Sequence, residues 1–154
     1  MENQTIKRNE KKYATLLHLS VFAKYFIPFG NFVMPIILWS TKKGTSDYID
    51  HNGKQVLNFQ LSILTYSLLL LIFAVPLIVY FAFNSIGFKE IENGNILIQE
   101  IAAGNIPNLV IVAAISVSLY AIMKLAEFFI IIYEAIKANN GEPVEYPFTI
   151  NYLK

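Results

Sequence analysis

The sequence predicts an all-α integral membrane protein, in which two full transmembrane helices follow an N-terminal helical hairpin that is broken or re-entrant. Apolar residues make up 55% of the 154 residues and charged residues only 15%, whereas a soluble domain has about 25% charged residues. The apolar residues gather in three long blocks, 13–41, 56–83 and 106–137. This composition argues against a soluble globular protein, a disordered chain and a nucleic-acid-binding protein.

Charge and cysteine content narrow the possible functions further. The formal net charge is +1, so no bulk field would attract nucleic acid. The chain has no cysteine, which excludes disulfides, thiolate metal sites and cysteine nucleophiles. No segment follows a phosphate-loop or nucleophile-elbow pattern. We therefore expect no catalytic residue, no cofactor and no enzyme activity.

Blocks 56–83 and 106–137 are the predicted membrane spans. A helix rises about 1.5 Å per residue and the hydrocarbon core is about 30 Å thick, so about 20 apolar residues cross it. The first of these blocks has no charged residue, and the second has none before Lys124. We expect a surface helix and span over 45–84, an outer loop over 85–105 and a second span over 106–138.

Block 13–41 is interrupted near its middle. Pro28 removes a backbone donor and restricts the residue before it, and Gly30 and Asn31 follow as turn residues. One interpretation is a single long, kinked span. The other is a hairpin that turns at Pro28, Gly30 and Asn31, where a left-handed backbone would suit Gly30.

The positions of the basic residues favour the hairpin. The N-terminal tail 1–12 carries four Lys or Arg and the segment 42–54 carries three, whereas 85–105 carries one. By the positive-inside rule, the N-terminal tail, the segment after the first block and the C-terminal tail 139–154 are cytoplasmic. Block 13–41 must then enter the membrane and return to the cytoplasmic side. We expect one membrane domain over 13–154, with both termini in the cytoplasm.

Three polar side chains inside the apolar blocks form a candidate intramembrane site. Lys124 and Glu127 are three residues apart, so they share a helix face and can pair. Charges inside a bilayer are costly and usually face the bundle interior. His18 lies in the predicted hairpin and can respond to pH. The three residues could form a proton or ion relay or an anionic-substrate site, or they could be an internal salt bridge and a hydrogen-bonded histidine.

Other polar residues lie near the cytoplasmic start of the second block. Asn58 and Gln60 are the residue types that join membrane helices by hydrogen bonds, and we expect that role for them. Asp47, Asp50 and His51 contain metal-ligating groups, but a further ligand is missing nearby. We expect no metal site there.

Several motifs resemble a known family. They are His18-Leu19-Ser20, the Pro28–Asn31 break, Pro35 with Trp39, Asp50–Lys54, Asn58-Phe59-Gln60 and Lys137–Pro147. Together they resemble a family of small bacterial membrane proteins known as domain of unknown function forty-eight seventy. That family is similar to the Tic-twenty subunit of the chloroplast inner-envelope import machinery. The resemblance implies a helical bundle with both ends on one side of the membrane, and it implies no established activity.

These observations favour a non-catalytic, multi-pass protein of the bacterial cytoplasmic membrane. Its partners would be the lipid bilayer and other membrane subunits, and it would be an accessory factor of a larger assembly, for example in secretion or protein translocation. The alternative is a transporter of protons, ions or small solutes that uses Lys124, Glu127 and His18. Because two spans are too few to enclose a pore, that transporter would be oligomeric.

Overall fold

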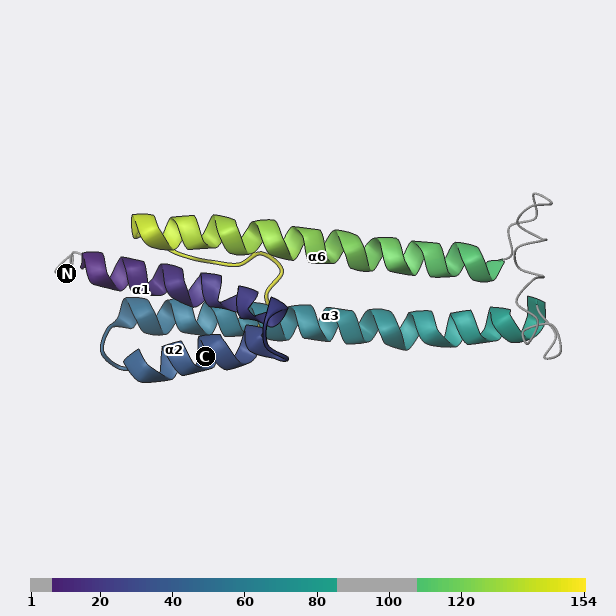
Figure 1. Ribbon diagram of the computed structural model, residues 1–154, viewed down its shortest axis with the longest axis horizontal. Helices are drawn as coiled ribbons and strands as arrows, with labels where there is room; N and C mark the ends of the chain where they lie inside the picture. Colours follow the sequence, from purple (N-terminus) through teal and green to yellow (C-terminus); the bar gives the residue numbers. More distant parts are fainter. Residues whose placement is uncertain (1–6, 86–107) are drawn as a thin grey trace. The chain divides into compact units, whose positions relative to one another are not determined.

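The computed structural model describes residues 7–85 and 108–154, and within these residues every regular element is a helix. The elements are α1 (Arg8–Leu19), a 3-10 helix η1 (Ser20–Tyr25), α2 (Gly30–Lys42), α3 (Asp47–Ser85) and α6 (Asn108–Asn140) (Figure 1). The predicted all-helical class is therefore confirmed for the described part of the chain. The predicted outer loop 85–105 lies outside it, apart from Ser85 at the end of α3.

Helices α3 and α6 are each long and apolar enough to cross a membrane. They correspond to the two predicted spans, and α3 contains both the predicted surface helix and the first span. Only 17% of the most apolar window of α3, and none of that of α6, is buried. A core helix of a soluble protein would instead be buried by its neighbours, so this exposure supports a membrane protein.

The chain divides into two compact units. The first contains residues 1–64 and 126–154, and the second contains 65–125. The described part of the first unit holds α1, η1, α2, the beginning of α3, the end of α6 and the C-terminal tail. The second unit holds the remaining parts of the two long helices, where large apolar side chains such as Ile72 and Val117 are exposed.

Within the first unit the chain reverses between η1 and α2, and α2 packs against η1 and α1. Phe29 has the left-handed backbone in this turn, with φ 57°, and Gly30 is already helical. A Cβ atom on Gly30 would lie 2.5 Å from the carbonyl carbon and oxygen of Ala23. Gly30 therefore does not take the left-handed backbone, which Phe29 adopts instead. The residue is glycine because α2 approaches the η1 backbone closely.

Helix α2 lies along the first part of α3 (Figure 1). Trp39 Nε1 donates a hydrogen bond of 2.9 Å to Asp50 Oδ1, and its ring covers Gly53, where a Cβ atom would collide with it. Nearer the turn, Asn31 Nδ2 donates to Gln60 Oε1 at 2.9 Å. These contacts fix the register of the hairpin on α3.

The C-terminal tail folds back into the first unit. Gly141 ends α6 with φ 83°, and the amides of Gly141 and Glu142 bond to carbonyls of the last helical turn, as in a Schellman motif. Val144 and Tyr146 are buried. The C-terminal tail therefore contributes to the core of this unit.

Candidate functional site

Buried polar side chains from four segments lie in the first unit. His18 comes from α1, Asn52 from α3, Glu127 and Glu134 from α6, and Tyr146 from the tail, and all five are nearly or fully inaccessible. A buried polar group without a partner is destabilising. The partners of these side chains therefore decide what the cluster can do.

His18 hydrogen-bonds through both ring nitrogens. The Asn52 amide nitrogen donates to the Tyr48 carbonyl oxygen, so its Oδ1 is the atom that accepts from His18 Nε2, at 2.8 Å. His18 Nδ1 then accepts from the Tyr146 hydroxyl at 2.7 Å. This arrangement satisfies a neutral imidazole. His18 lies outside both candidate spans, and burial lowers its pKa to about 4, so the ring is neutral at pH 7.

Tyr146 completes this network. Its ring stacks on Phe59, with centroids 4.2 Å apart. Burial, together with the carboxylates of Glu134 and Glu127, holds the pKa of Tyr146 well above its usual value. The hydroxyl therefore remains protonated and continues to donate to His18.

Glu127 has a partner that sequence spacing does not reveal. Lys24 Nζ of η1 lies 2.6 Å from Glu127 Oε1, so the hairpin supplies the positive charge for this buried carboxylate. The predicted pairing of Glu127 with Lys124 stays a prediction. The Lys124 ammonium also lies 5.5 Å from the centroid of the Tyr120 ring. His18 and Glu127, which the transporter alternative places on one path, have separate hydrogen-bond partners.

Glu134 is buried beside Lys137 one turn later. Lys137 Nζ lies 3.1 Å from Glu134 Oε2, although no hydrogen bond of good geometry reaches that oxygen. Lys137 Nζ instead donates a long hydrogen bond of 3.5 Å to the other carboxylate oxygen, Glu134 Oε1.

Asn58 and Gln60 have different roles in the first unit. Gln60 joins α3 to α2 through Asn31, as an interhelical amide would. Asn58 instead binds the tail, because its Oδ1 accepts from Leu153 N at 2.7 Å and its Nδ2 donates to Leu153 O at 3.0 Å. The Asn58 side chain therefore bonds to the tail backbone as a neighbouring strand would.

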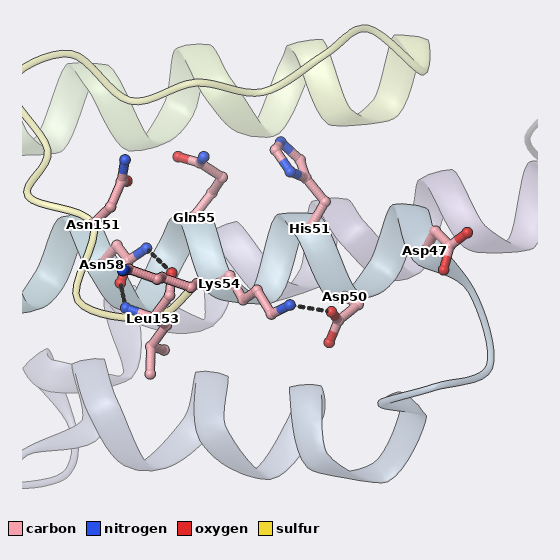
Figure 2. A pocket seen from close by; sticks show the side chains of 9 residues that line it. Asp47, Asp50, His51, Lys54, Gln55, Asn58, Asn151 and Leu153 are labelled. Atoms are coloured by element: carbon pink, nitrogen blue, oxygen red, sulfur yellow. Dashed lines mark hydrogen bonds and ion pairs between the residues drawn. The ribbon is translucent and has the colours of Figure 1, made fainter.

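A surface pocket of about 530 Å³ lies over the first turns of α3 (Figure 2). Its lining residues are Asp47, Asp50, His51, Lys54, Gln55, Asn58, Asn151, Leu153 and Lys154. Asp50 is paired with Lys54 at 2.7 Å, and His51 Nε2 donates to Val144 O at 2.9 Å. Among the described residues, no group of three or more His, Cys, Asp or Glu is placed to hold a metal ion.

The fold and these contacts are those of a small helical protein that has two candidate membrane spans and whose buried polar groups bind one another. A family model agrees with this class. The model of the MamF/MmsF family, the magnetosome magnetite crystal formation protein family, matches residues 9–153. The chain therefore belongs to that family. No curated protein and no solved structure matches the chain significantly.

This match corrects the resemblance drawn from the motifs. The family is the magnetosome crystal-formation family, and not domain of unknown function forty-eight seventy or a Tic-twenty-like family. Proteins of the MamF/MmsF family are magnetosome membrane proteins that are not known as enzymes, so the prediction that the chain is not an enzyme is confirmed. The match supports a membrane location but not the cytoplasmic membrane in particular, and it does not point to secretion.

Proposed function

We propose that this chain is a non-catalytic accessory protein of the magnetosome membrane, and that it takes part in magnetite crystal formation together with other membrane proteins. The observation that carries this proposal is the family match over residues 9–153. The exposed apolar windows of α3 and α6 support the membrane location. The mutual pairing of the buried groups, as in Lys24 with Glu127, supports a structural role over a catalytic one.

In this proposal the hairpin 13–41 enters the membrane from the cytoplasm and returns to it. The bond between Asn31 and Gln60 supports a re-entrant turn. That bond folds the turn back against the first part of α3 within the first unit. Both termini are then cytoplasmic, as the basic residues indicate.

Deletion of the gene in a magnetosome-forming host tests the proposed function. We expect magnetite crystals of altered size or shape in electron micrographs, restored when the wild-type chain is supplied. The protein should also co-purify with isolated magnetosomes. Unchanged crystals in the deletion strain, or a protein absent from purified magnetosomes, would contradict the proposal.

A further inference from the structure

Two phenylalanines combine a left-handed backbone conformation with a largely exposed side chain. Phe29 and Phe148 are the non-glycine residues with positive φ in the described part of the chain, at 57° and 56°. Bulky residues rarely adopt this left-handed conformation, and it often marks a functional position. Both side chains are nearly fully accessible, at 76% for Phe29 and 87% for Phe148. Packing in the core therefore does not explain why these turns carry aromatic rings.

The two turns lie at the same level of α3. Two residues after Phe29, Asn31 bonds to Gln60 at 2.9 Å. Two residues after Phe148, the Ile150 amide donates to Ser62 Oγ at 2.8 Å. Gln60 and Ser62 are two residues apart on one helix, which is about 3 Å along its axis. The hairpin turn and the tail turn are thus anchored at almost the same height.

This height is also where the exposed apolar surface of α3 starts. The large exposed apolar residues of α3 begin at Leu64 and continue to Phe83, which is the part that would face lipid. Beside Phe29, the residues Tyr25 and Phe26 are exposed as well. Contiguous exposed apolar patches mark contact surfaces, and aromatic residues are suited to the boundary between headgroups and acyl chains.

We propose that Tyr25, Phe26, Phe29 and Phe148, here termed the aromatic rim, insert into the acyl chains just below the headgroups of one leaflet. The C-terminal tail is then a second lipid anchor, separate from the hairpin. Lipid is the occupant because both turns are anchored at Gln60 and Ser62, just before Leu64, the first large exposed apolar residue of α3. This inference rests on the membrane location in the proposed function.

Spin labels on single cysteines test the rim, because the chain has no native cysteine. The variants Phe29→Cys and Phe148→Cys are reconstituted in vesicles of phosphatidylcholine and phosphatidylglycerol. Electron paramagnetic resonance then compares the accessibility of each label to oxygen, which concentrates in lipid, and to a water-soluble nickel complex. The matched controls are Ile72→Cys, on the exposed apolar run of α3, and Glu145→Cys, on the exposed part of the same tail.

We expect the oxygen-to-nickel ratio at both rim positions to approach that at Ile72→Cys and to exceed that at Glu145→Cys several-fold. A water-like ratio at Phe148→Cys with a lipid-like ratio at Ile72→Cys would overturn the rim while leaving the membrane span intact. A water-like ratio at Ile72→Cys would instead contradict the membrane location. Shielding of Phe148→Cys from both reagents would show a protein occupant and would also overturn the proposal.

A second tail label keeps the test decisive if Phe148→Cys does not fold. Ile150 is half-exposed, and its bond to Ser62 comes from the backbone amide, so Ile150→Cys retains that anchor. We expect its label to be more accessible to oxygen than to the nickel complex. A label at this position with the water-like ratio of Glu145→Cys would overturn the proposal in the same way.

Discussion

The ammonium group of Lys24 lies 2.6 Å from the carboxylate of Glu127, although 103 residues separate them in the sequence. Glu127 is fully buried, whereas a fifth of the Lys24 side chain is accessible. Burying a carboxylate without a partner is strongly unfavourable. The pair therefore ties η1 to the second half of α6. The position of the hairpin then depends on the negative charge of Glu127.

Replacement of Lys24 by methionine should destabilise the first unit. The substitution leaves Glu127 buried and uncompensated, at an expected cost of about 2–3 kcal/mol, below the usual range for a buried pair because Lys24 is partly exposed. The double variant Lys24→Met with Glu127→Leu should lose less than the sum of the two single variants. The free energy of unfolding in detergent micelles measures this, and purely additive losses would show that the two groups are not coupled.

The same double-mutant cycle tests the predicted pairing of Lys124 with Glu127. In this cycle Lys124→Met is combined with Glu127→Leu, and the free energy of unfolding is measured under the same conditions. We expect a coupling free energy above zero, because residues three apart on a helix share a face and can pair. Purely additive losses would contradict the predicted pairing.

The two glycines Gly30 and Gly44 should respond differently to alanine. At Gly30 the new Cβ atom meets the Ala23 backbone, so Gly30→Ala should cost about 3 kcal/mol through overpacking. At Gly44, φ is 79° and nothing lies within 4 Å, so Gly44→Ala should cost only about 1 kcal/mol of backbone strain. Thermal unfolding of both variants compares them, and equal losses would contradict the close approach at Gly30.

The His18 network predicts a loss of stability in mild acid. The folded-state pKa of His18 is about 4, against 6.5 for the free side chain, so the unfolded chain binds a proton first as the pH falls. The stabilisation is complete above about pH 6.5 and declines towards pH 4, by about 3 kcal/mol at most.

His18→Gln, which cannot titrate, provides the control for this prediction. Unfolding free energies measured between pH 7 and pH 4.5 should fall less steeply for this variant than for the wild type. Parallel curves for the two proteins would mean that His18 is not held neutral by the fold.

Asn58 should control the release of the C-terminal tail. Asn58→Ala removes both bonds to the Leu153 backbone, so the last residues should become more accessible. Digestion by a carboxypeptidase in detergent should then be several-fold faster than for the wild type. Gln55→Ala, one turn earlier on α3 and also lining the pocket, is the matched control. Equal digestion rates for both variants would argue against the Asn58 contact.

The sequence predicts those features that local patterns determine. The spans follow from the length of apolar runs, and the break at Pro28 follows from backbone chemistry. The partners of His18 could not be predicted, because Asn52 and Tyr146 lie 34 and 128 residues away.

Long-range contacts also account for the features that the sequence-based interpretation did not reveal. Lys24 carries no local signal that Glu127 is its partner. Its place after Pro28 predicts that Gly30 is a turn glycine. The close approach of α2 to the η1 backbone, which requires a glycine there, appears only in the folded structure.

In the proposed arrangement, the hairpin 13–41 returns to the side of the membrane from which it enters. Single cysteines at Asn9 and Thr45, on either side of the hairpin, test it most directly in sealed vesicles of known orientation. A membrane-impermeant maleimide should label both positions only from the cytoplasmic side. Labelling of the two positions from opposite sides would make the block a single span and would contradict the account.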